Sequence, residues 1–166
     1  MAYSRLLSKT LARRLGEPRR FIQVVAGPHQ VGKTTLVRQV AEGSRLVTHY
    51  ASADEPTLRG RDWIAQQWDA ARLATGKCRA VLILDEIQKI TGWSETVKRL
   101  WDEDTRGKRP LKVVLLGSAP LLIARGLTES LAGRFEVLHL PHWSYAEMKT
   151  VFGYSLDHYL YYGGKL

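Results

Sequence analysis

Residues 27–35, Gly-Pro-His-Gln-Val-Gly-Lys-Thr-Thr, constrain the fold of this chain more than any other stretch. The first eight have the spacing G-x-x-x-x-G-K-[ST] of a phosphate-binding loop, which requires a strand before it and a helix after it. Residues 21–26 are apolar and rich in β-branched side chains, as expected of a buried parallel strand. Leu36, Val37 and Val40 then recur at helical spacing. The motif therefore stands between a predicted strand and a predicted helix.

The residue types in this loop suit the binding of nucleotide phosphates. Gly27 and Gly32 allow tight turns and a close approach of the backbone to a ligand. Backbone N–H groups are expected to converge on phosphate oxygens at the positive end of the following helix. Lys33 is expected to reach the β- and γ-phosphates, and the Thr34 hydroxyl to ligate Mg²⁺. The predicted nucleotide-binding residues are Gly27, Pro28, His29, Gln30, Val31, Gly32, Lys33, Thr34 and Thr35.

Four further apolar stretches predict strands, at residues 46–51, 80–86, 113–118 and 135–140. Amphipathic helices are predicted between them, one from about Asp62, a candidate cap, to Leu73. Strands that alternate with helices predict an α/β fold, a parallel sheet with helices on both faces. The C-terminal ends of its strands all lie along one side of the sheet, the edge at which ligands of such sheets bind.

Several polar residues follow these predicted strands and are expected to converge at that edge. Asp85 ends an apolar strand, where a bound Mg²⁺ would offset the cost of a desolvated carboxylate, and is predicted to hold the ion opposite Thr34. Glu86, pointing the other way, is predicted to orient and polarise the attacking water. Ser118 is a candidate hydrogen-bond partner of the γ-phosphate or of the attacking water, or simply a small residue that ends a strand. Arg134 lies just before the fifth predicted strand and is expected to point outward rather than to join these residues. It is a candidate arginine finger for a neighbouring subunit, or an ordinary surface arginine.

The length of 166 residues fits one domain with its own core. No apolar run approaches the ~18 residues that would span a membrane. The single cysteine, Cys78, excludes an internal disulfide and suits a reducing compartment, so a cytoplasmic location is predicted.

Positive charge gathers at the N-terminus of this chain, whose net charge is +9. Glu17 is the only acidic residue among residues 1–20, which contain Arg5, Lys9, Arg13, Arg14, Arg19 and Arg20. Leu7, Leu11 and Leu15 lie four apart, which predicts a basic amphipathic helix. Such a helix can pack beside the nucleotide fold, bind nucleic acid or an acidic protein partner, or act as a targeting peptide.

Four segments together resemble a large prokaryotic group of AAA+-type ATPases. They are residues 27–35, 84–88 (Leu-Asp-Glu-Ile-Gln), 116–119 (Leu-Gly-Ser-Ala) and 129–134 (Glu-Ser-Leu-Ala-Gly-Arg). The resemblance runs from about Phe21 to Gly164 and implies a P-loop NTPase three-layer fold with a five-stranded sheet in the order 5-1-4-3-2. It also implies that Asp85 and Glu86 are the acidic pair, Ser118 a sensor and Arg134 a finger. The group often has arginine where this chain has His29.

The resemblance also implies a division of the chain. Residues 1–20 are predicted to form a basic helix, residues 21–142 the AAA+-type core, and residues 143–166 the start of a helical lid that is incomplete here. Ser144 and Glu147 have the spacing of a capping box, which predicts a helix start.

The function predicted from these features is binding and Mg²⁺-dependent hydrolysis of ATP, with ATP and Mg²⁺ as cofactors. Two alternatives stay open: a nucleotide-responsive binding module with little turnover, and a nucleic-acid-associated ATPase. The partners considered are the nucleotide, further copies of the chain, and a nucleic acid or protein bound by the basic N-terminal segment. The absence of a guanine-reading N-K-x-D motif favours ATP over GTP.

Overall fold

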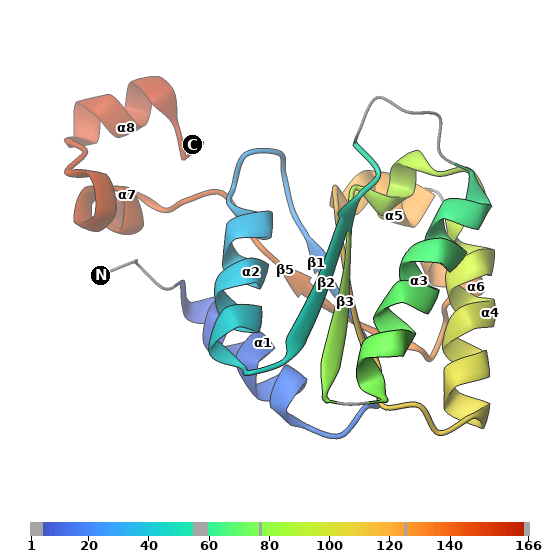
Figure 1. The fold of residues 1–166 in the computed structure, drawn as a ribbon. Helices are drawn as coiled ribbons and strands as arrows, with labels where there is room; N and C mark the ends of the chain where they lie inside the picture. The colour runs from blue at the N-terminus through green and yellow to red at the C-terminus, as the bar shows by residue number, and fades with distance from the viewer. Residues whose placement is uncertain (1–4, 55–59, 77, 125, 165–166) are drawn as a thin grey trace.

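A computed structural model describes residues 5–54, 60–76, 78–124 and 126–164. Its centre is a five-stranded parallel sheet in the order β2-β3-β4-β1-β5 (Figure 1). The strands are β1 (Ile22–Ala26), β2 (Val47–Ser52), β3 (Ala80–Asp85), β4 (Lys112–Gly117) and β5 (Phe135–His139). This is the predicted order 5-1-4-3-2 read from the other edge, so the predicted fold class is confirmed.

Helices cover both faces of the sheet. They are α1 (Leu6–Gly16), α2 (Lys33–Gly43), α3 (Arg61–Thr75), a short 3-10 turn η1 (Ile87–Lys89), α4 (Trp93–Arg106), α5 (Ala119–Ala124), α6 (Leu127–Ser130), α7 (Tyr145–Phe152) and α8 (Leu156–Tyr162). In Figure 1, α1 and α2 lie on one face, α3 and α4 on the other, and α7 and α8 lie beyond the sheet. The layers are therefore helix, sheet and helix.

The inner strands are buried on both faces because successive side chains point to opposite sides. In β1, Val24 packs into the core beneath α3 and α4, and Val25 into the core beneath α1 and α2. The alternation repeats in β3, where Leu82 and Ile83 enter opposite cores. Continuous apolar runs in the sequence therefore correspond to strands covered on both sides.

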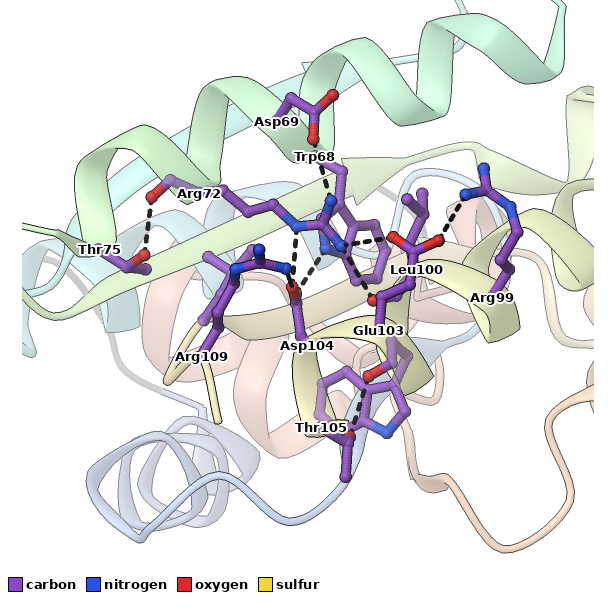
Figure 2. A network of polar contacts seen from close by, with 12 residues as sticks. Trp68, Asp69, Arg72, Thr75, Arg99, Leu100, Glu103, Asp104, Thr105 and Arg109 are labelled. Carbon is purple, nitrogen blue, oxygen red and sulfur yellow. Dashed lines mark hydrogen bonds and ion pairs between the residues drawn. The ribbon is translucent and has the colours of Figure 1, made fainter. Parts of the chain in front are cut away.

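A buried carboxylate joins α3 to α4 (Figure 2). Asp104 is fully buried and accepts hydrogen bonds from Trp68 Nε1 at 2.7 Å and Arg72 Nε at 2.8 Å. Arg109 lies 3.4 Å from the same carboxylate. Because a buried charge is costly unless paired and hydrogen-bonded, these contacts explain how Asp104 is tolerated there. Asp104 therefore links α3 to α4 through hydrogen bonds and an ion pair.

Two local predictions can be compared with the helix ends. The predicted capping box is confirmed, since Ser144 and Glu147 exchange both hydrogen bonds at the start of α7. The predicted cap of α3 is wrong: Gly60 occupies the N-cap, and Asp62 lies in the first turn. A carboxylate there still meets the positive end of the helix, which accounts for the misleading pattern.

The basic N-terminal segment packs against the sheet domain. Leu11 and Leu15 are buried in the core that contains the α2 residues Leu36 and Val37. This placement supports the packing interpretation of the amphipathic pattern. Residues 1–4 and 165–166 of the two predicted terminal segments lie outside the described residues. Among the described residues, no helix is both long and apolar enough to cross a membrane.

Candidate functional site

The loop between β1 and α2 turns through two left-handed residues. Gln30 has φ 59° and Gly32 has φ 85°, and Gly32 is the N-cap of α2. Left-handed residues among right-handed ones create concavities of backbone N–H groups that bind anions. At the N-terminus of α2, this loop therefore has the form expected of a phosphate site.

Gly27 is required because the segment after β5 packs closely against it, and not only because a ligand must approach the loop. A Cβ at Gly27 would lie 2.3 Å from the carbonyl oxygen of Leu140, directly after β5. The same close packing is seen where Leu140 N–H donates to Ala26 O at 2.8 Å. Gly27 thus allows the segment after β5 to pass against the start of the loop.

Lys33 is held inside this loop. Its side chain is 6% exposed, and Nζ donates to Gly27 O at 3.0 Å and to Pro28 O at 2.6 Å. Burial lowers the pKa of Lys33, and the nearby carboxylates of Glu86 and Asp85 oppose that shift. An ammonium stripped of water and surrounded by carbonyls can exchange those partners for phosphate oxygens.

The phosphate loop and the acidic end of β3 are in direct contact. Thr34 Oγ1 donates to Asp85 Oδ2 at 2.7 Å, and the Asp85 side chain is buried. The other carboxylate oxygen of Asp85 accepts the N–H of Glu86 at 2.9 Å. Two segments that are distant in sequence therefore bring a hydroxyl and a carboxylate together.

Tyr50, which the sequence analysis did not select, also binds this carboxylate. Its hydroxyl donates to Asp85 Oδ2 at 2.8 Å, and the guanidinium of Arg38 lies 4.0 Å from the centre of its ring. Burial, together with Asp85, raises the pKa of Tyr50 to about 12, so the hydroxyl remains a donor at neutral pH. In the sequence, the signal that could have identified Tyr50 is a polar aromatic residue near the end of the predicted strand that became β2, the partner of β3.

We expect Tyr50→Phe to weaken ATP binding only when Mg²⁺ is present. One hydrogen bond to Asp85 contributes about 0.5–1.5 kcal/mol, which corresponds to about a 2- to 10-fold loss of MgATP affinity. Titration calorimetry with and without Mg²⁺ measures this, with the exposed Tyr161→Phe as matched control. Equal losses in both conditions would show that Tyr50 does not act through a metal ion held by Asp85.

Glu86 does not continue the strand. β3 ends at Asp85, and Glu86 has φ 53°, a left-handed conformation that non-glycine residues rarely adopt. The expected strand alternation between Asp85 and Glu86 is therefore wrong, because the chain turns at this residue. Such backbone conformations cost about 1–3 kcal/mol and cluster at functional sites.

Gln88 holds Glu86 in place. Gln88 Nε2 donates to Glu86 Oε2 at 2.6 Å, and the Gln88 side chain is buried. A Cβ on Gly117 would lie 2.3 Å from Gln88 Oε1, so the glycine at the end of β4 makes room for this amide. Gln88 belongs to the 84–88 segment, but sequence reasoning gave it no role.

Ser118 lies at the end of β4, beside the phosphate loop. It lines a cavity of about 480 Å³ together with Gly27, Pro28, His29 and His139. That volume falls within the range of small-molecule sites. The structure therefore places Ser118 and the loop at one cavity.

Arg5 and Trp143 attach the phosphate loop to the segments that flank it. Both donate to the carbonyl of Val31, Arg5 Nη1 at 3.3 Å and Trp143 Nε1 at 3.1 Å. Arg5 is buried and also pairs with Glu147 of α7 at 3.1 Å. Sequence reasoning counted Arg5 only as basic charge, whereas here it joins three parts of the chain.

Comparison with known proteins assigns the family. A family model described as "AAA domain" matches residues 19–149. The chain belongs to this AAA domain family. It is therefore an AAA-type ATPase module with a P-loop nucleotide-binding fold.

One similar solved structure is the Thermotoga maritima RuvB Holliday junction branch migration motor, with a TM-score of 0.58 and 24% identity. The match covers 87% of this chain and 45% of that chain, so this AAA domain spans less than half of that protein. At this identity the likeness shows the fold alone. A search of curated proteins found no match.

Arg134 is not brought together with the other predicted site residues of the AAA domain. It directly precedes β5, and its carbonyl accepts the N–H of Ile22, the first residue of β1, at 2.8 Å. Arg134 therefore lies at the N-terminal end of the strands, opposite the phosphate loop. Its guanidinium donates to both oxygens of Asp102 on α4, at 2.8 and 3.0 Å.

Proposed function

We propose that this AAA domain binds ATP with Mg²⁺ and hydrolyses it. The observation that carries the proposal is the hydrogen bond of 2.7 Å between Thr34 Oγ1 and Asp85 Oδ2. It joins the phosphate loop to the acidic strand end and sets a hydroxyl and a carboxylate side by side. Such oxygen atoms are the ligands that Mg²⁺ prefers.

Thr34 and Asp85 would hold Mg²⁺ together with phosphate oxygens and water. Among the described residues, no group of three or more His, Cys, Asp or Glu side chains forms a metal site by itself. This fits Mg²⁺ in NTPases, which is usually bound by one or two protein side chains plus the substrate phosphates. Bound there, the ion would neutralise charge that develops on the β- and γ-phosphate oxygens.

The other residues of the site have separate roles in nucleotide binding and hydrolysis. Lys33 exchanges the Gly27 and Pro28 carbonyls for the β- and γ-phosphates, and Ser118 donates its hydroxyl to the γ-phosphate. Glu86, oriented by Gln88, positions a water for attack on the γ-phosphorus and accepts its proton as the bond to the β-phosphate oxygen breaks. Binding, metal and base functions thus come from three neighbouring strand ends.

The test is phosphate release by the purified chain in excess Mg²⁺ and in excess EDTA. We expect turnover in Mg²⁺ and none in EDTA. ATP bound tightly without phosphate release would favour the alternative of a nucleotide-responsive binding module. A cytoplasmic location remains a prediction from the lone cysteine.

The proposal also includes self-association, with Arg134 as a finger for a neighbouring copy. Arg134 would have to exchange Asp102 for a γ-phosphate, and both side chains of this pair are partly exposed. A finger supplied by a neighbour contributes about 10³–10⁵ in rate. In the same assay, Arg134→Ala should lose activity while Asp102→Ala keeps it. Equal activities would leave Arg134 with the structural role of its ion pair.

A further inference from the structure

Five cations gather near the N-terminal ends of the strands, at the end of the sheet opposite the phosphate loop. This basic cluster consists of Arg14, Arg19, Arg20, Arg79 and Lys112. They come from the end of α1, from the connection to β1, from the residue before β3 and from the first residue of β4. Figure 1 shows the α1–β1 connection and the start of β3 at the same end of the sheet. The charge predicted for the N-terminal segment is therefore joined here by cations from elsewhere in the chain.

Hydrogen bonds to backbone carbonyls hold the cluster together. Arg79 Nη2 donates to Gly16 O at 3.4 Å, and Lys112 Nζ donates to the carbonyl of Glu17. Arg19 donates from all three guanidinium nitrogens, Nε to Leu111 O at 2.9 Å, Nη1 to Thr105 Oγ1 at 2.8 Å and Nη2 to Trp101 O at 3.0 Å. Four of the five cations line a cavity of about 70 Å³, which is large enough to hold more than one water molecule.

The carboxylates nearby do not balance this charge. Glu17 and Glu136 line the cavity beside its four cations. Glu136 lies 3.4 Å from Arg14, and Glu17 pairs with Arg13 outside the cluster at 3.7 Å. Within the described residues, neither Arg20 nor Arg79 has an ion-pair partner; Arg20 lies over the ring of Phe21. Burial lowers the pKa of Lys112, and the guanidinium groups of Arg79 and Arg19 lower it further against the influence of Glu17.

We propose that the basic cluster binds backbone phosphates of a nucleic acid. Guanidinium groups match phosphate oxygens with two parallel hydrogen bonds. Arg20 lines the cavity, and Arg79 joins the cluster from the residue before β3. Phosphates bound along the cluster would supply the negative charge that Arg20 and Arg79 lack.

The extent of positive charge at this end of the sheet favours a nucleic acid over an acidic protein segment. Further exposed cations stand at the same ends of neighbouring elements: Arg45 before β2, Arg106 at the end of α4 and Lys108 before β4. A row of cations across several strands suits a polymer that carries charge at regular short intervals. The cluster lies away from the nucleotide site, so this proposal does not rest on the proposed hydrolysis.

The test is fluorescence anisotropy with a labelled DNA duplex of about 20 base pairs, and with one of its single strands, at several salt concentrations. The test variant is Arg20→Ala/Arg79→Ala. The matched control, Arg99→Ala/Lys149→Ala, removes the same charge at two exposed sites outside the cluster. We expect the test variant to bind about tenfold or more weakly, with a salt slope shallower by about two, because each lost phosphate contact removes about 0.9. The control should bind as wild type does.

Several results would overturn the proposal: no binding by wild type, equal weakening in both variants, or poly-glutamate displacing DNA at equal charge. Thermal unfolding checks the fold of each variant. If the double variant does not fold, Arg20→Glu alone provides the test, because Arg20 is exposed and its guanidinium lies 5.0 Å from the centre of the Phe21 ring. The duplex and single-strand arms show which form of nucleic acid is preferred.

Discussion

Lys33→Ala is expected to weaken MgATP binding by about 30-fold or more. Lys33 supplies the only ammonium within the phosphate loop, and its side chain is buried. Removing one partner of a buried, hydrogen-bonded charge pair costs about 2–5 kcal/mol, or about 30-fold and more in affinity. Titration calorimetry with MgATP measures the loss.

The fold should survive this substitution. The alanine variant loses two hydrogen bonds to Gly27 and Pro28 but also removes an ammonium that burial desolvates, as its lowered pKa shows. We expect the free energy of unfolding without nucleotide to change by about 1 kcal/mol or less. Lys149→Ala, which removes an exposed charge on α7, is the control and should bind as wild type does. Wild-type affinity in Lys33→Ala would contradict the assignment of the phosphate loop.

The sequence predicted those parts of the fold that depend on local patterns. The runs that became β1, β3 and β4 are mostly apolar because both faces of each strand are covered. The loop motif predicted where a nucleotide would bind, and the resemblance implied the strand order, which the structure confirms. Strand C-termini then met at one edge, as the chain topology requires.

Contacts that depend on side-chain direction were not predictable in this way. Tyr50 reaches Asp85 only because β2 pairs with β3 in a particular register, which no local pattern specifies. Glu86 was expected to follow the pleat of a strand, but a left-handed turn sets its direction. Gln88 depends on space left by Gly117 on another strand. Each of these needs knowledge of two elements at once.

Glu86→Gln is expected to separate ATP binding from ATP hydrolysis. Glutamine keeps the shape and the left-handed backbone position but cannot accept a proton from water. Removal of a general base typically costs about 10²–10⁴ in rate. The neighbouring Gln88 amide, which now donates to Glu86 Oε2 at 2.6 Å, can donate to the glutamine oxygen in the same way. Affinity for MgATP should therefore change little while kcat falls steeply.

Phosphate release from the MgATP complex, measured side by side in wild type and Glu86→Gln at saturating ATP, tests the central claim most directly. Calorimetry on the same samples establishes that both are loaded with nucleotide. We expect wild type to release phosphate with steady turnover, and the variant to hold ATP with release slower by about 100-fold or more. Equal release by the two loaded proteins would contradict hydrolysis at this site with Glu86 as its base.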